Sequence, residues 1–129
     1  MAQRIAQDEL SNVVLKEVPA PAIADPGPIG LAGFAMTTFV LSVFNAGIFS
    51  TSLEPVVFPI AFFYGGMVQL LAGMWEFRKN NTFGALAFSS YGAFWISFGL
   101  YAVMFLPGLP AASAAQATGL FLTVWGFFT

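Results

Sequence analysis

The side chains that could do chemistry in this chain are mostly neutral hydrogen-bonding groups set in apolar runs. They are the hydroxyls of Thr37 and Thr38, the amides of Asn45 and Gln69, and one carboxylate, Glu76. Polar groups at membrane depth are costly, so they usually face a bundle interior or a water-filled path. Hydroxyls and amides bind a small solute weakly enough to release it, as conduction requires.

The residues that most enzyme and metal sites use are missing. The chain has no His and no Cys. Their absence removes disulfides, the usual zinc sites and the Ser-His or Cys-His arrangements of nucleophilic catalysis. Because nothing forms a nucleophile–base set, we expect no enzyme activity, no metal site and no cofactor.

Composition indicates the environment of the chain. Hydrophobic residues make up 58% of the 129 residues and charged residues only 8%. A soluble domain carries roughly 25% charged residues. Four Lys/Arg and a net charge of -2 also exclude a protein that follows nucleic-acid phosphates. We therefore predict an integral membrane protein in a lipid bilayer, with no nucleic-acid partner.

The apolar runs predict an all-α fold, a polytopic transmembrane helix bundle. Residues 1–25 carry six of the ten charges and are expected to form a polar tail. Residues 26–129 are expected to form the bundle, because a helix of roughly 20 apolar residues crosses the hydrocarbon core. Four spans are predicted, at about residues 29–49, 55–77, 82–106 and 115–129.

The fourth span is short and ends the chain inside an apolar stretch. Counted from about residue 115 it has only about 15 residues, fewer than the roughly 20 that a span needs. We therefore expect the chain to be a truncated copy of a longer protein.

The basic residues predict the orientation in the cell membrane. Arg4 and Lys16 lie in the tail, and Arg78 and Lys79 lie between spans two and three. Two spans separate these segments, so both lie on one side. The positive-inside rule places the N-terminus and residues 78–81 in the cytoplasm of a multi-pass protein.

Helical spacing places the polar residues on common faces of the spans. The polar side chains on these faces allow two interpretations: they line a solute route, or they bond neighbouring helices together. Hydroxyls can also bond back to their own helix. The faces are Phe34, Thr38, Leu41 and Asn45 with Thr37 beside them; Gly65, Gln69, Ala72 and Glu76; Gly84, Phe88, Tyr91, Trp95 and Phe98; and Ser90, Ser97 and Tyr101.

Glu76 also allows two interpretations. It can bind a proton or control a gate in a transport path. Alternatively, it pairs with Arg78 or Lys79 near the cytoplasmic end of its span.

Several ordered motifs resemble one family. The segment Asp25-Pro26-Gly27-Pro28-Ile29-Gly30-Leu31 resembles the signature Asn-Pro-Ala-Pro-Leu-Gly-Leu of the acetate uptake transporter family, also called GPR1/FUN34/YaaH. Asp25 stands where that signature has Asn and adds a carboxylate at the pore mouth. The resemblance continues through Asn45-Ala46-Gly47, Phe63-Tyr64-Gly65-Gly66, Asn81-Thr82-Phe83-Gly84, Ser90-Tyr91-Gly92-Ala93-Phe94-Trp95 and the last eight residues.

The resemblance implies a function and a set of site residues. It implies six helices, of which four are present here, and a ring-shaped homo-oligomer, a hexamer with a pore in each subunit. It implies uptake of acetate and related short carboxylates such as succinate, either with protons or through a channel-like path. It implies a hydrophobic constriction at Phe34 and Tyr91. We expect the mouth at Asp25, Pro26, Gly27, Pro28 and Gly30, and the substrate path along Thr37, Thr38, Asn45, Gln69, Ser90 and Trp95.

Two other functions stay open from the sequence. One is a channel for another small solute, such as ammonium or water. The other is a structural or regulatory membrane protein that does not itself transport.

Overall fold

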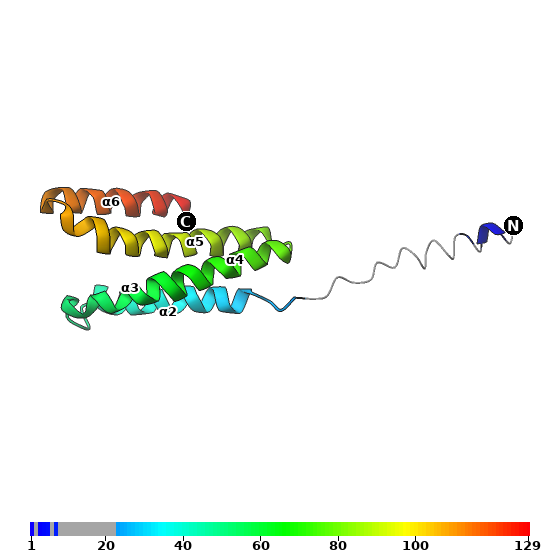
Figure 1. Ribbon diagram of the computed structural model, residues 1–129, viewed down its shortest axis with the longest axis horizontal. Coiled ribbons are helices and arrows are strands. Elements are labelled where there is room, and N and C mark those ends of the chain that lie inside the picture. Colours follow the sequence, from blue (N-terminus) through cyan, green and yellow to red (C-terminus); the bar gives the residue numbers. More distant parts are fainter. Residues whose placement is uncertain (2, 6, 8–22) are drawn as a thin grey trace.

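The described chain is a bundle of four long helices, three of them packed together and one applied to the side (Figure 1). The structure is a computed structural model that describes residues 1, 3–5, 7 and 23–129. Most of the expected polar tail, residues 1–25, lies outside the described residues. The helices confirm the all-α class, and four of them are long and apolar enough to cross a membrane.

The first long helix, α2, spans Gly27–Asn45. Pro26 and Pro28 start it, because proline is tolerated in a first turn whose N–H groups have no helical partner. Gly47 ends it with a left-handed φ of 69°. The Gly47 and Ile48 N–H groups then bond back to the carbonyls of Phe44 and Val43, a Schellman ending. Helix α2 therefore ends at Asn45, whereas the apolar run predicted a span that reaches about residue 49.

The second transmembrane rod is one continuous helix with changes of pitch. It begins as a 3-10 helix, η1 (Thr51–Val56), which covers the gap between the first two predicted spans and the start of the second. It continues through α3 (Val57–Ile60), the π-helical segment η2 (Ala61–Val68) and α4 (Gln69–Arg78). Hydropathy does not predict the π-helical turns, which often mark functional sites.

A tight turn joins the second rod to α5 (Thr82–Leu100). Asn80 adopts a φ of 59° there, and the Asn81 N–H bonds to the Glu76 carbonyl. The Asn81 side chain then caps α5 by accepting a hydrogen bond of 3.1 Å from the Gly84 N–H. Helix α5 runs on through η3 (Tyr101–Phe105) and η4 (Leu106–Gly108).

The last helix, α6, spans Ala111–Phe128 and begins at Pro110. It starts earlier than residue 115, because the Ala-rich segment that follows Pro110 has strong helix propensity despite its mild hydropathy. In Figure 1 it lies antiparallel to α5 and away from α2. None of its described residues is buried.

Two kinds of packing hold the bundle. Glycines bring α2, the second rod and α5 into close contact: a Cβ added at Gly33 would lie 2.6 Å from the Tyr64 carbonyl oxygen. A Cβ added at Gly92 would lie 2.6 Å from the Leu70 nitrogen. Small residues of this kind let helix backbones approach in membranes. Helix α6 instead contacts α5 through aromatic rings, including Phe121 stacked on Phe94 and Tyr101.

Candidate functional site

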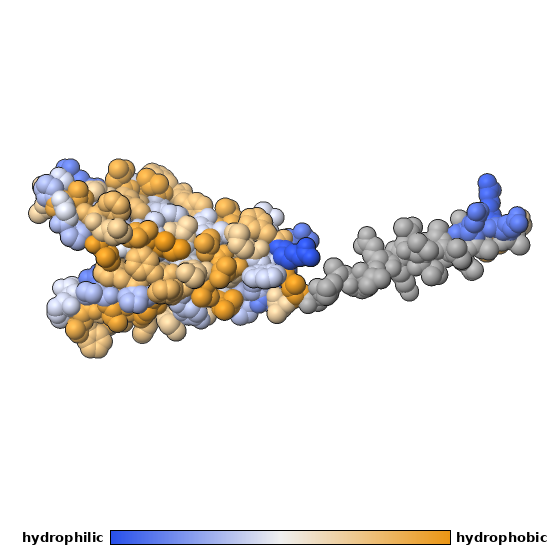
Figure 2. All heavy atoms as spheres, in the orientation of Figure 1, coloured by the Kyte–Doolittle hydropathy of each residue, from blue (hydrophilic) through white to orange (hydrophobic). Residues whose placement is uncertain are grey.

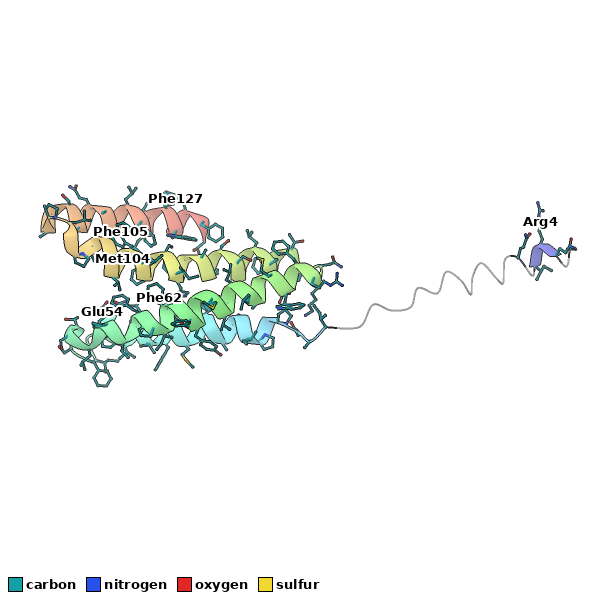
Figure 3. The ribbon with its side chains drawn as sticks, viewed as in Figure 1. Arg4, Glu54, Phe62, Met104, Phe105 and Phe127 are labelled. Carbon is teal, nitrogen blue, oxygen red and sulfur yellow. The ribbon has the colours of Figure 1, made fainter. Side chains whose placement is uncertain are left out.

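Three cavities follow one another along α5 and its continuation. The mouth cavity, about 460 Å³, lies at the end where the chain enters α2. The central cavity, about 310 Å³, lies between α2, α5 and α6. The far cavity, about 360 Å³, lies between η1, η3 and α6, beside Glu54 at the opposite end of the bundle (Figure 3). Residues spaced by about one helical turn from Gly84 to Leu106 line them in order.

The mouth cavity contains the charged groups of the site. The Lys79 Nζ lies 2.7 Å from the Asp25 Oδ1, and that oxygen also accepts a hydrogen bond of 3.0 Å from the Gly27 N–H. The Lys79 ammonium, and then the Gly27 N–H, lower the pKa of the Asp25 carboxyl below its ordinary value of 3.8. Asp25 is therefore ionised at neutral pH.

Glu76 lies deeper on the same cavity and is only 1% exposed. Its Oε2 accepts a hydrogen bond of 2.8 Å from the Asn81 amide. The sequence offered Arg78 or Lys79 as its partner, and the structure pairs Lys79 with Asp25 instead. The difference arises because the Glu76 side chain points into the bundle, where Asn81 folds back over it after the turn.

Gln69 places a polar group without a hydrogen-bond partner among the described residues on the mouth cavity. The side chain is 1% exposed, and its Oε1 has no hydrogen-bond partner among the described residues. Leaving such a group unmet costs about 1–3 kcal/mol. The free atom is an oxygen, so it could accept a hydrogen bond from a protonated carboxyl group or another donor, but not from a carboxylate.

An aromatic pair separates the mouth cavity from the central cavity. Phe34 and Tyr91 line both cavities, and their ring centroids lie 5.9 Å apart at 43°. Phe128 of α6 packs edge-on against Tyr91 with centroids also 5.9 Å apart. The residues predicted to form a constriction are therefore in contact, and α6 adds a third ring.

The central cavity is uncharged. Its polar groups include the hydroxyls of Thr38 and Thr129, and Trp95 forms part of its wall. The Thr38 Oγ1 is buried without a hydrogen-bond partner in the described part of the chain. A second aromatic layer of Phe94, Phe98 and Phe121 then lies toward the far cavity.

Three predicted path residues lie off the cavities. Thr37 is fully buried, and its hydroxyl donates back to the Gly33 carbonyl of its own helix at 2.9 Å. Asn45 is the last residue of α2 and is exposed. Ser90 is half-buried and outside the residues that line the three cavities. Thr38 and Gln69 line cavities, whereas Asn45, predicted to share a face with Thr38, is exposed at the end of α2.

The mouth motif has mixed roles. Asp25 and Gly27 line the mouth cavity. Pro26 is buried as the residue before α2 and Pro28 lies in its first turn. Gly30 admits the Phe88 ring, since an added Cβ would lie 2.9 Å from that ring.

Sequence reasoning missed several contributors. Lys79 and Asn81 line the mouth cavity, and Trp125, Gly126 and Phe128 bring α6 to the central part of the site. An Asn directly before an apolar helix is a capping signal that marks Asn81. From the sequence, Lys79 predicted the orientation and was one of two expected partners of Glu76, and its ion pair with Asp25 was not predicted.

Comparisons with known proteins agree on one family. The model described as the GPR1/FUN34/yaaH family matches residues 8–129. The chain is 45% identical over 109 residues to the succinate-acetate/proton symporter SatP of Escherichia coli K12, covering 83% of this chain and 56% of that protein. It is 48% identical to acetate permease A of Emericella nidulans over an alignment of 133 positions, covering 94% of this chain and 44% of that protein. It is 44% identical over 123 residues to ammonia transport outward protein 2 of Saccharomyces cerevisiae, covering 92% and 44%.

A solved structure shares the fold. The bacterial acetate channel SatP superposes with a TM-score of 0.73 at 43% identity, over 83% of this chain and 58% of that one. The chain thus spans about half the length of the curated relatives that it matches.

Proposed function

The chain belongs to the GPR1/FUN34/yaaH family, and from this we propose that it takes up acetate and related short carboxylates such as succinate across the cell membrane. The line of three cavities along α5, interrupted by the Phe34–Tyr91 pair, is the observation that carries the proposal. Relatives named as transporters and a channel for these acids support the choice of substrate.

The walls suit a small carboxylate that must leave again. Such an acid is ionised at neutral pH, because carboxyl pKa values lie near 4. A cation in the central cavity would hold the anion too firmly, and the lining residues there are uncharged. The Thr38 hydroxyl, which has no partner among the described residues, can donate a hydrogen bond to a carboxylate and binds it more weakly than a cation would. Phe34, Tyr91 and Phe128 then restrict passage to small solutes.

The same proposal includes assembly and orientation. We infer that residues 26–129 form the transmembrane part, with the N-terminus and the 78–81 turn in the cytoplasm. Large apolar side chains cover the outside of the helices, with hydrophilic residues toward the ends (Figure 2). A homo-oligomer, a hexamer by family resemblance, would cover part of that surface and leave a path in each subunit.

Proton coupling involves Glu76 in this proposal. Its buried carboxyl group lies on the mouth cavity and is hydrogen-bonded to Asn81, so a proton that enters this cavity can reach it. Glu76→Gln keeps the shape and removes the exchangeable proton. Uptake that ceases to respond to an imposed pH gradient in this variant would support coupling through Glu76.

The decisive experiment measures labelled acetate uptake into proteoliposomes that contain the chain. Gly126→Trp places an indole in the central cavity, where an added Cβ meets open space, and should abolish uptake. Gly119→Trp is the matched control on the same helix, also in open space but off the cavities, and should keep uptake near the unchanged level. Equal uptake by both variants would contradict a route through the central cavity.

A second candidate function is transport of ammonium, favoured by the relative named ammonia transport outward protein 2. Labelled methylammonium in the same vesicles separates the two solutes. Uptake of neither solute by the chain alone, together with its co-purification with a longer relative, would instead indicate a structural or regulatory subunit.

A further inference from the structure

Two buried polar side chains of α4 line the mouth cavity, and both carry hydrogen-bond acceptors. Gln69 and Glu76 are each 1% exposed and lie about two helical turns apart on the same face. The Gln69 Oε1 has no hydrogen-bond partner among the described residues. Glu76 accepts from the Asn81 amide at 2.8 Å and forms no ion pair within the described part of the chain. A ligand that satisfies the free oxygen must therefore bring a hydrogen-bond donor.

The charge of the mouth cavity disfavours an anion. The charged residues of its lining are Asp25, Glu76 and Lys79, and Tyr91 adds a phenol. Two carboxylates and one ammonium leave a negative formal charge, and the ammonium is already paired with Asp25 at 2.7 Å. The neighbouring cation, Arg78, does not line the cavity. A second negative charge near the buried Glu76 would be repelled, because charges interact strongly where water is scarce.

The remaining wall of the mouth cavity is mostly apolar. It includes Leu31, Phe83, Ala87 and Phe88. Apolar surroundings disfavour an ionised ligand, which would lose its hydration there. A short carboxylic acid in its protonated form meets each of these conditions, because it has an O–H donor, no charge and a small apolar tail. Its carbonyl oxygen can also accept from a glutamine N–H, so the acid and the Gln69 amide are complementary.

We propose that the mouth cavity binds short carboxylic acids in their protonated, uncharged form, and that Gln69 recognises the acid O–H group through its free oxygen. The proposal rests on the proposed function in taking these acids as the ligand. The Thr38 hydroxyl beyond the Phe34–Tyr91 pair can donate or accept, so the central cavity admits the acid with or without its proton. Glu76 contributes by repelling the carboxylate. Loss of that repulsion in Glu76→Gln would also weaken the response of uptake to pH.

The first test uses two uncharged probes of nearly equal size on the unchanged chain in a non-ionic detergent. Acetamide has an N–H donor and a carbonyl, as the protonated acid has a donor and a carbonyl. Acetone has the carbonyl alone. In NMR titrations acetamide should bind about two- to tenfold more tightly than acetone, the range for one hydrogen bond. Equal affinities for acetamide and acetone would overturn the proposal.

The second test follows acetate as a competitor of bound nitrogen-15 acetamide between about pH 5 and pH 7. The protonated fraction of a carboxylic acid falls about tenfold for each pH unit above its pKa. The affinity for acetate, relative to that for acetamide, should therefore fall about tenfold per pH unit. Acetamide does not titrate in this range, so it corrects for changes in the protein itself. A constant ratio would mean that the anion binds and would overturn the proposal.

A pair of variants tests whether Gln69 is the recognising residue. Gln69→Met keeps an unbranched side chain of similar length without the amide, and it should lower the affinity for acetamide to that for acetone. Ser89→Ala is the matched control, since the Ser89 Oγ is also buried without a partner among the described residues but lies outside the cavity lining. It should bind acetamide as the unchanged chain does. Undiminished acetamide binding by a Gln69→Met variant with normal helical circular dichroism would overturn the assignment, and the comparison of probes does not depend on either variant.

Uptake into proteoliposomes distinguishes this inference from the proposed function. Acetate uptake by the unchanged chain, with equal binding of acetamide and acetone, leaves the function standing and removes the proposed recognition at the mouth. Binding that requires the donor and Gln69, without uptake of acetate, supports the recognition and removes the function.

Discussion

Single residues determine how closely the helices approach. At Gly92 the absence of a side chain lets α5 lie against the Leu70 backbone, with 2.6 Å between that nitrogen and the position of a Cβ. Backbone cannot move aside as a flexible side chain can. The close packing of α4 against α5 therefore requires glycine at position 92.

Gly92→Ala should lower the stability of the bundle. Overpacking of this kind typically costs about 1–3 kcal/mol. Thermal unfolding in detergent, monitored by circular dichroism, measures the loss. Gly119→Ala is the control, because a Cβ there meets open space and alanine favours a helix. A melting temperature for Gly92→Ala at or above that of Gly119→Ala would contradict the seam.

A second residue-scale prediction concerns Asp25. Lys79→Gln removes the ammonium that chiefly lowers the pKa of the Asp25 carboxyl, so that pKa should rise toward 3.8. Carbon-13 NMR titration of aspartate carboxyls measures it, and the chain has only one other aspartate, Asp8. An unchanged Asp25 pKa in the variant would mean that the ion pair does not form in solution.

The lowered pKa of Asp25 determines how the stability of the fold depends on pH. The pKa is lower in the folded state, so the ion pair stabilises the mouth above pH 3.8. The contribution is lost as the pH falls through the lowered pKa. Lys79→Gln should therefore remove an acid-sensitive part of the stability and leave neutral-pH folding otherwise intact.

The residue scale is also where the sequence is least informative about the site. Helical spacing predicts Thr38 and Gln69 as site residues, the family resemblance implies Phe34 and Tyr91, and all four line cavities in the structure. The sequence does not reveal that the Thr37 hydroxyl donates a hydrogen bond to the Gly33 carbonyl of its own helix, or that Asn45 is exposed. These outcomes depend on helix rotation and on the glycine contacts, which involve residues distant in the chain.

At the scale of elements, α6 differs from the other helices. It is attached through ring stacking and a hydrogen bond of 2.8 Å between the Tyr101 and Thr118 hydroxyls. Phe121 contacts Phe94, Phe98 and Tyr101 with centroids 5.6 to 6.4 Å apart. The central cavity depends on this attachment, because α6 provides one of its walls.

Phe121→Ala should loosen α6 from α5. Each aromatic pair is worth about 0.5–1.5 kcal/mol beyond its buried area, and this substitution removes several. Hydrogen exchange of the amides of residues 111–128 in detergent micelles should quicken, while the amides of residues 82–100 stay protected. Leu120→Ala is the control, because Leu120 is 68% exposed. Equal exchange in the two variants would argue against an aromatic attachment.

Element boundaries could be predicted only where a local signal exists. Pro26 and Pro28 mark the start of α2, and the Asn80–Asn81 turn is evident from its polarity. The fourth span was predicted from about residue 115, although Pro110 directly precedes α6. Gly47 ends α2 earlier than hydropathy suggested, since hydropathy does not register a left-handed φ. The π-helical turns of η2, a segment that packs against α2 and α5, have no hydropathy signature.

For the whole molecule, the two ends differ in charge. Asp25, Glu76, Arg78 and Lys79 gather at one end, and Glu54 lies at the other. Phe127 stands on the outer side of α6 and is 89% exposed (Figure 3). The arrangement suits a bilayer around the helices and water at both ends.

Single cysteines test the proposed orientation on a chain that has none of its own. Leu53→Cys lies at the end with Glu54, and Thr82→Cys lies at the start of α5. An impermeant maleimide added to intact cells should label Leu53→Cys at once and Thr82→Cys only after lysis. The opposite pattern would reverse the proposed topology.

The two kinds of seam have a consequence for how such a sequence can change over generations. Where Gly33 and Gly92 let backbones touch, no larger residue fits without moving a helix. Phe94 contacts Phe121 and Trp125 through aromatic rings. There, a smaller side chain at one position can be compensated by a larger one at its partner, if the total volume is kept. Changes in substrate range should therefore come from substitutions on the α5–α6 side of the path. The close packing of α2, the second rod and α5 through glycines should stay unchanged.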